Sequence, residues 1–286
     1  MRDNESGPGI YKDFAFGADS KQPSMKEYGY DYWFATGNVA RPSHKDPLNF
    51  FLNGTAMGKM EGFSAQIVAR EIADWLLIKY RKKGQPFFMT VWFHEPHGPI
   101  DSDPEFIKRY KNLSKDPSLP QYLANVTQID EAVGTIVKIL KDEGLFDNTL
   151  IWYSSDNGPE GPHDLGSFNT SDSFLGGSRY RGSTGGLRGR KRHTHEGGIR
   201  VPGIICWPAG FKEHGVSPGS ISTTPIIGSD VFPTLLELAG IALPEKVTLD
   251  GESIVSLLKN GQFNRSKPLY WRNTFKEFQV ALRDGD

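Results

Sequence analysis

Two continuously apolar runs, each preceded along the chain by a long amphipathic pattern, constrain the fold more than any other feature. The runs are Phe87–Phe93 and Thr149–Ser154, and turn-forming residues flank both of them. Runs of this length and composition are typical of strands buried on both faces. Apolar residues recur at helical spacing from Ser64 to Gly84 and again over residues 121–142, so the spacing predicts a helix before each strand.

The order helix, strand, helix, strand predicts an α/β fold. Parallel strands joined by crossover helices give a mostly parallel central sheet flanked by helices. A further strand is predicted at Ile199–Trp207, and further helices at Ser229–Leu238 and Gly251–Lys259. Residues 1–27 are rich in Gly, Pro, Ser and charge, which predicts an irregular lead-in. In open sheets of this kind, functional residues gather beyond the carboxyl ends of the strands.

The composition is that of a globular protein with a substantial core. Hydrophobic residues make up 37% of the 286 residues, and the formal net charge is -1. So small a charge gives no reason to expect nucleic acid or an anionic membrane as the main partner. No apolar run approaches the roughly 20 residues that span a bilayer. The polar opening, Met1–Gly7, contains no apolar segment of a signal peptide.

Acceptor sequences for N-linked glycans, Asn-x-Ser/Thr, are the main clue to a compartment. They occur at Asn4, Asn53, Asn112, Asn125, Asn169 and Asn264. Each alone is compatible with chance, but the set favours a secretory glycoprotein whose leader lies outside this sequence. The single cysteine, Cys206, excludes an internal disulfide. It lies in an apolar run without an adjacent base, which predicts a buried and inert thiol.

Asp156 and Asn157 place two oxygen ligands side by side where the second apolar run ends. Neighbours in a regular strand point to opposite faces, so both can hold one ion only if the backbone leaves the pleat, which Gly158-Pro159 favours. A carboxylate beside a carboxamide suits Ca²⁺ or Mg²⁺ rather than Zn²⁺, and either ion needs further ligands from elsewhere. An Asx-type turn that ends the strand explains the same residues.

His97 stands in a rigid turn after the first apolar run, between Pro96 and Gly98. From this turn the imidazole can face the same sheet edge and donate to an anion or carry a proton. His94 lies in the preceding turn and is a weaker candidate. In isolation, a structural or surface role explains either histidine better.

The segment Leu187–Pro202 concentrates positive charge beside glycines. Glycine-permitted turns surrounded by fixed cations are what a pocket for a tetrahedral dianion requires. Lys191 lies inside this basic tract. Because neighbouring side chains alternate in an extended segment, only some of Arg188, Arg190 and Arg192 can share a pocket with it. A solvated basic loop and a nucleic-acid patch are the alternatives, although the tract lacks interleaved aromatic residues.

Taken in order, these motifs resemble the sulfatase family of the alkaline phosphatase superfamily, and within it the arylsulfatase A and N-acetylgalactosamine-6-sulfatase type. The resemblance covers most of the chain, and the place of Lys191 five residues before Glu196 makes it specific. The matching segments are Gly29–Phe34, Pro96–Pro99, Ser155–Gly158, Leu187–Lys191, Glu196–Pro202, Asp230–Leu235 and Leu249–Gly251. The resemblance implies an alkaline-phosphatase-like fold, here incomplete.

The resemblance also implies a role for each candidate residue. Asp156 and Asn157 would supply half of a Ca²⁺ site, with Mg²⁺ the less favoured ion. As catalytic and substrate-binding residues, Lys191 would bind the sulfate and His97 would contact the sulfate or the leaving oxygen. In the family, a cysteine or serine in Cys/Ser-x-Pro/Ala-x-Arg becomes formylglycine, whose hydrate attacks sulfur. This sequence lacks that motif and the family's early Asp-Asp pair, so formylglycine is expected only in the full-length protein.

The resemblance further predicts the domain organisation and the compartment. Residues 28–265 are expected to form the C-terminal portion of the sulfatase catalytic domain, and residues 266–286 the start of a truncated C-terminal subdomain. We expect the full-length protein to be secreted, lysosomal or periplasmic, although this chain has no signal peptide of its own.

Three functions compete for these residues. The first is an arylsulfatase-like sulfuric ester hydrolase acting on a sulfated carbohydrate or an aryl sulfate, of which this chain is a fragment that lacks the nucleophile and is inactive alone. The second is a non-catalytic relative that binds sulfated glycans. A phosphatase or phosphodiesterase is the third, and Lys191 speaks against it, since a lysine replaces the charge of a second metal ion. No pattern predicts a membrane span, a nucleic-acid partner or an oligomeric state.

Overall fold

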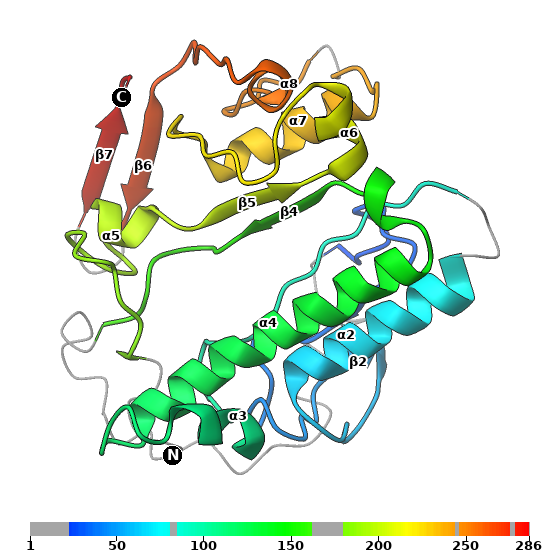
Figure 1. Cartoon of the computed structure of the whole chain (residues 1–286), viewed down its shortest axis with the longest axis vertical. Coiled ribbons are helices and arrows are strands. Elements are labelled where there is room, and N and C mark those ends of the chain that lie inside the picture. The colour runs from blue at the N-terminus through cyan, green and yellow to red at the C-terminus, as the bar shows by residue number, and fades with distance from the viewer. Residues whose placement is uncertain (1–22, 81–84, 162–179, 244–245, 275–277, 286) are drawn as a thin grey trace. The chain divides into compact units, whose positions relative to one another are not determined.

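The fold is described from a computed structural model of the whole chain (Figure 1). The structure describes residues 23–80, 85–161, 180–243, 246–274 and 278–285. The chain divides into two compact units, residues 1–142 with 160–183, and residues 143–159 with 184–286. The predicted division of the chain at residue 265 stays a prediction. None of the described helices is both long enough and apolar enough to cross a membrane.

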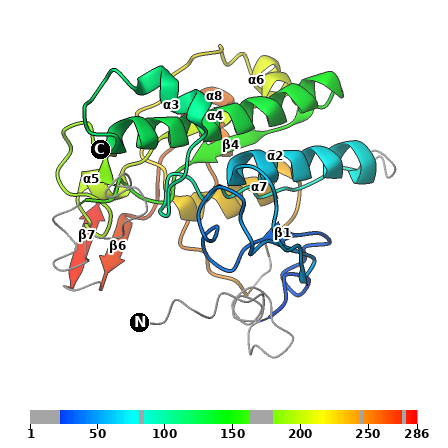
Figure 2. The same ribbon diagram turned by 90° about the horizontal axis from the view of Figure 1, so that it is seen from below.

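Helices dominate the first unit. They are α2 (Ser64–Asp74), which a π-helical turn over Trp75–Tyr80 continues, α3 (Pro104–Tyr110) and α4 (Ser118–Asp142). Helices α2 and α4 lie side by side (Figure 2). The two helices predicted from apolar spacing are therefore confirmed, and Gly84, the predicted end of the first, lies outside the described residues.

Small side chains let α2 and α4 approach each other closely. Ala65 and Ala69 of α2 and Ala132 of α4 form a buried cluster, against which Phe93 and Ile136 pack. Alanine adds little bulk at a helix interface and has the best helix propensity, so it suits this contact. Because Phe93 packs on this cluster, the segment that leads to His97 is held against the helix pair.

A small antiparallel sheet completes the first unit. Its strands are β1 (Phe34–Ala35), β2 (Phe51–Leu52) and β3 (Thr55–Ala56), in the order β1-β2-β3. The tight turn between β2 and β3 has φ of 48° at Asn53 and 85° at Gly54, a left-handed conformation that Asn and Gly tolerate best.

The predicted strand at Phe87–Phe93 is wrong. The segment is extended but pairs with no strand among the described residues. Its side chains alternate between half-buried and exposed, and Phe88 and Trp92 are 65% and 77% exposed. Continuous apolarity predicts burial on both faces, yet only the face carrying Phe93 packs on helices. A β-strand also needs hydrogen bonds to the backbone of a neighbouring segment, and apolar composition alone does not predict those.

The second unit contains two antiparallel strand pairs (Figure 1). The first joins β4 (Ile151–Ser154) to β5 (Gly203–Cys206), with Ile151 opposite Cys206 and Ser154 opposite Gly203. The second joins β6 (Leu269–Asn273) to β7 (Gln279–Arg283).

The predicted parallel pairing is therefore wrong for the strands that the structure describes, although β4 and β5 confirm two predicted strand positions. Predicted strand Ile199–Trp207 is shortened at its start, because helix α5 occupies Glu196–Ile199. The chain then enters β5 in the direction opposite to β4, so no crossover helix is needed.

Three further helices belong to this unit. They are α6 (Pro208–Glu213), α7 (Val231–Leu238) and α8 (Val255–Asn260). The last two confirm the predicted helices at Ser229–Leu238 and Gly251–Lys259, with a 3-10 turn over Gly228–Asp230 before α7.

A buried ion pair fixes the start of α7. Asp230 is fully buried, and its carboxylate oxygens lie 2.5 and 3.1 Å from the guanidinium nitrogens of Arg265. The same carboxylate accepts the backbone N–H groups of Ile227 and Glu252, both at 2.9 Å. With four donors around it, the buried charge is fully compensated, which makes each partner costly to remove.

Burial corrects two predictions about single residues. Asn125 is fully buried, so a glycan there is incompatible with this packing, whereas Asn53, Asn112 and Asn264 are exposed. Asn4 and Asn169 lie outside the described residues. Cys206 is half-buried rather than buried.

Candidate active site

The turn that carries His97 is fixed by hydrogen bonds on both sides of the histidine. Its backbone N–H donates to the His94 carbonyl over 2.9 Å, and its Nδ1 lies 2.8 Å from the Gly98 carbonyl oxygen. A carbonyl only accepts, so this contact assigns the proton of the neutral ring to Nδ1 and the lone pair to Nε2. The side chain is exposed. An imidazole held in this tautomer can take up or return a proton at Nε2.

Glu95 anchors this turn to the start of helix α2. Its side chain is buried, and Oε1 accepts from the Ser64 hydroxyl at 2.5 Å and from the Ala65 N–H at 2.9 Å. Helix α2 has no side-chain cap at its N-cap position and no acidic residue in its first turn. Glu95 therefore supplies from outside the helix the negative charge that a helix N-terminus favours. Because Glu95 is two residues from His97, α2 restrains the place of the histidine turn.

A neutral, buried histidine supports the same region. His44 is fully buried, and its Nδ1 accepts from the Asn125 amide of α4 at 3.1 Å. Burial lowers the pKa of His44 to about 3, because the charged ring would lose its hydration. Asn125 also donates to the Asp101 carbonyl at 3.2 Å. Helix α4 thus holds the chain before and after the His97 turn.

His94, the weaker candidate, fits a structural role. Its Nε2 lies 2.8 Å from the Thr36 hydroxyl, and its ring packs edge-on against Phe50 at 5.4 Å between centroids. Burial lowers the pKa of His94 to about 4, so the ring is neutral near pH 7.

Asp156 and Asn157 follow the end of β4 after one intervening residue, Ser155. The backbone bends away from the strand at these residues, as the sequence predicted. Asp156 is exposed and Asn157 is half-buried. Neither side chain has a hydrogen-bond partner among the residues described, so the alternative of an Asx-type turn is not what the structure has. Both side chains are therefore available as oxygen ligands.

Backbone hydrogen bonds tie Lys191 to the end of β4. The Lys191 N–H donates to the Pro159 carbonyl at 3.0 Å, and the Gly158 N–H donates to the Gly198 carbonyl at 2.9 Å. These contacts bring the basic tract and the Asp156–Asn157 pair onto one backbone junction, although they are separated by more than thirty positions in the sequence.

Glycines make this junction possible. A Cβ atom on Gly158 would lie 1.9 Å from the Gly197 carbonyl oxygen. A Cβ on Gly197 would lie 2.2 Å from the Gly189 oxygen, and one on Gly198 would lie 2.2 Å from the His193 oxygen. No side chain fits at such distances, so the Glu-Gly-Gly motif is required by close backbone approach.

The described residues contain no group of three or more His, Cys, Asp or Glu side chains arranged to hold a metal ion. Asp156 and Asn157 amount to two oxygen ligands, whereas Ca²⁺ takes six to eight. The pair could supply only part of such a site, and the calcium half-site stays a prediction.

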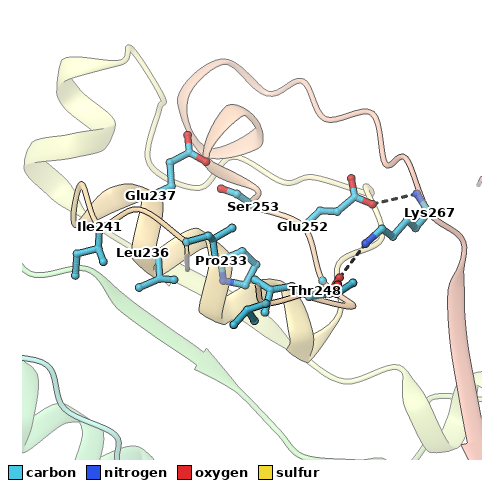
Figure 3. A pocket seen from close by; sticks show the side chains of 12 residues that line it. Pro233, Leu236, Glu237, Ile241, Thr248, Glu252, Ser253 and Lys267 are labelled. Carbon is cyan, nitrogen blue, oxygen red and sulfur yellow. Dashed lines mark hydrogen bonds between the residues drawn. The ribbon is translucent and has the colours of Figure 1, made fainter. Parts of the chain in front are cut away.

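A separate pocket of about 660 Å³ lies in the second unit beside α7 (Figure 3). Its walls are mostly apolar, with Glu252 and Lys267 on one side. These two groups are engaged, because Glu252 accepts the Lys267 N–H at 3.0 Å and the Lys267 ammonium donates to the Leu249 carbonyl at 2.8 Å. A third charged residue, Glu237, also lines the pocket. None of the predicted site residues lines this pocket.

The structure thus brings Lys191 to the end of β4 beside the Asp156–Asn157 pair. His97 belongs to the first unit and the other three to the second, so its association with them stays a prediction. Sequence reasoning missed Glu95 and His44 as supports of the histidine turn. The one available signal was the start of α2, where no acidic residue follows Ser64.

Comparisons with known proteins identify the family of this chain. The family description "Sulfatase" matches residues 9–241. Rat steryl-sulfatase is 34% identical over 193 residues, covering 68% of this chain and 29% of that protein. Human arylsulfatase A is 33% identical over 199 residues, covering 70% of this chain and 33% of that protein. The chain therefore spans less than half the length of these curated relatives.

Solved structures also resemble this chain in fold. Ps i-CgsB in complex with k-i-k-neocarrahexaose matches with a TM-score of 0.66 and 26% identity, over 82% of this chain and 49% of that chain. The PsFucS1 sulfatase from Pseudoalteromonas sp. matches in fold with a TM-score of 0.60 and 23% identity, over 83% of this chain and 45% of that chain. These likenesses define an alkaline-phosphatase-like hydrolase fold. The chain belongs to the sulfatase family, which confirms the resemblance seen in its motifs.

Proposed function

We propose that the protein to which this chain belongs hydrolyses sulfuric esters, and that its substrates are sulfated carbohydrates. The observation that carries the proposal is the backbone junction that holds Lys191 beside Asp156 and Asn157, with an N–H to carbonyl distance of 3.0 Å from Lys191 to Pro159. A cationic residue and two residues with hard oxygen ligands at one backbone junction suit the negatively charged sulfate group of a sulfuric ester. The neocarrahexaose bound to Ps i-CgsB supports a sugar substrate over a simple aryl sulfate.

In this proposal, Asp156 and Asn157 hold Ca²⁺, with Mg²⁺ less suitable. Their side chains lack other partners among the described residues, and a carboxylate with a carboxamide is a calcium donor set. The bound ion would neutralise charge that develops on the sulfate oxygens. The remaining ligands have to come from residues other than this pair.

Lys191 and His97 supply the protein's own acid–base and anion-binding groups. The Lys191 ammonium binds a sulfate oxygen, and His97 exchanges a proton with the leaving oxygen at Nε2, because Nδ1 faces the Gly98 carbonyl at 2.8 Å. The family nucleophile, formylglycine, requires a Cys/Ser-x-Pro/Ala-x-Arg motif that this sequence lacks. We therefore expect these residues alone to bind sulfate esters without turning them over.

Two alternatives are weaker. A purely glycan-binding relative is not favoured, since the similar proteins are named for sulfatase activity. A phosphatase of the same superfamily would use a second metal ion, and Lys191 speaks against it, since a lysine replaces the charge of that ion. The proposed compartment of the whole protein is secretory, lysosomal or periplasmic, and exposed acceptors at Asn53, Asn112 and Asn264 support it.

The test begins with the complete transcript. An in-frame Cys-x-Pro-x-Arg after an Asp-Asp pair, upstream of Met1, supports the enzyme. The encoded polypeptide should then hydrolyse 4-nitrophenyl sulfate in the presence of Ca²⁺, and Lys191→Ala should lower kcat by about 100-fold or more. A complete polypeptide that cleaves 4-nitrophenyl phosphate faster than the sulfate, or whose activity survives Lys191→Ala, would contradict the proposal.

A further inference from the structure

The basic tract, Leu187–Pro202, contains more positively charged side chains than the binding of one sulfate group requires. Within Leu187–Pro202, the only carboxylate is that of Glu196. It is already engaged, since its oxygens lie 3.5 Å from Arg200 and 3.7 Å from Arg283. Among the residues described, neither Arg188 nor Lys191 has an acidic partner. The tract therefore presents two uncompensated cations, of which the proposed function uses only Lys191.

Arg188 is held as firmly as Lys191. Its carbonyl accepts the Gly197 N–H at 2.7 Å, inside the junction that also fixes Lys191. The following residue, Gly189, has φ of 79°, and a Cβ there would meet the Cβ atoms of His195 and His193 at 2.9 and 3.0 Å. These contacts restrain the backbone at Arg188, whose side chain is exposed.

The spacing of the two cations suits two anionic groups on one ligand. Two residues lie between them in the sequence, so their Cα atoms are at most roughly 11 Å apart. A guanidinium offers a planar fork that matches a sulfate or carboxylate with two hydrogen bonds, which a lysine does not. Arg188 therefore has the chemistry of a second anion-recognition group rather than of a duplicate of Lys191.

We propose that Arg188 determines specificity by binding a second anionic group of the same saccharide. The preferred substrates are then carbohydrates that carry at least two sulfate or carboxylate groups, with one sulfate at Lys191 and another anion at Arg188. This inference rests on the proposed function, because it assumes that Lys191 binds a sulfate. Nucleic acid fits less well, since the tract has no interleaved aromatic residues and the net charge is -1.

The experiment compares two ligands that differ at the amino group, which carries an acetyl group in one and a sulfate in the other. Binding of N-acetyl-D-glucosamine 6-sulfate and of D-glucosamine 2-N,6-O-disulfate to the whole chain is measured by calorimetry at fixed ionic strength. The variants are Arg188→Gln, Lys191→Met and the control Arg200→Gln, an exposed arginine of the same tract whose charge is already paired with Glu196. Circular dichroism verifies that each variant is folded.

We expect Arg188→Gln to weaken the disulfate about tenfold and the monosulfate less than about twofold, as loss of one charge-assisted contact implies. Arg200→Gln should change neither. Equal weakening of both ligands by Arg188→Gln, or no change in either, would overturn the inference. Equal loss of affinity in Arg188→Gln and Arg200→Gln would also overturn it, because equal losses indicate non-specific electrostatic attraction. Binding of an oligonucleotide by the chain would point to the same non-specific attraction. The Lys191→Met variant tests the proposed function separately: if it binds both ligands normally, Lys191 is not the sulfate site.

Discussion

The closest backbone contact of the site gives its sharpest structural prediction. The perturbation is Gly158→Ala, which adds one methyl group at the end of β4. The new Cβ would lie 1.9 Å from the Gly197 oxygen and 2.9 Å from the Gly197 carbonyl carbon, whereas contacts under 3.0 Å are essentially never seen. Relief requires the two backbone segments to separate by at least about 1 Å. Both are held by hydrogen bonds, so the whole junction has to move.

Overpacking of this kind lowers the free energy of unfolding by about 1–3 kcal/mol. We expect a value at the upper end of this range, because the clashing atoms belong to the backbone and cannot move aside easily. The assay is urea denaturation followed by tryptophan fluorescence. The matched control is Gly203→Ala, because no atom lies within 4 Å of a Cβ at Gly203, in the strand that pairs with β4. We expect the control to be neutral or slightly stabilising. If the two variants unfold within about 0.5 kcal/mol of each other, the close approach of Gly158 and Gly197 is not real.

Other predictions follow from buried charge and burial. Asp230→Asn should lower the free energy of unfolding by about 3–5 kcal/mol, because it leaves the Arg265 guanidinium without its counter-charge. The control is Asp147→Asn, at an exposed aspartate. An equal loss of unfolding free energy in the control would contradict this prediction. Glu95→Ala should cost about 1–2 kcal/mol through loss of the cap on α2, and hydrogen exchange should show the loss in the first turn of that helix. Burial lowers the pKa of His44 from 6.5 to about 3, so the unfolded chain binds more protons between these values. The contribution of His44 to stability is then greatest above pH 6.5 and falls as the pH drops, by up to about 1.4 kcal/mol per pH unit, and His44→Gln should flatten the slope of acid denaturation curves by that amount.

The sequence predicted the helices well because their pattern is local. The apolar spacing of α2 and α4 is set by residues that are neighbours on one helix face, and both helices form where that spacing occurs. Strand pairing depends on which other segment comes alongside. The residues of Phe87–Phe93 do not determine which segment lies beside them, so the strand predicted there was wrong. The residues of β4 and β5 do not determine whether the two strands run parallel or antiparallel, so the predicted parallel pairing was wrong as well.

The residues of the candidate site could be proposed from the sequence because their chemistry lies in short motifs. The Asp156–Asn157 pair and Lys191 are recognisable from residue type and order, and the structure joins them through the glycines of the same motifs. The support for His97 could not be predicted. Glu95 reaches Ser64 across 31 positions, and His44 reaches Asn125 across 81, so neither contact leaves a local pattern.

The central claim is that Asp156, Asn157 and Lys191 form one site for a metal ion and an oxyanion. The most direct measurement replaces Ca²⁺ with paramagnetic Gd³⁺ and follows line broadening of the backbone N–H signals of the chain by NMR. The account predicts that broadening at low Gd³⁺ concentration centres on Asp156, Asn157 and Lys191, and that Asp156→Ala abolishes it. Broadening centred on other acidic residues, or unchanged in the Asp156→Ala variant, would contradict the account.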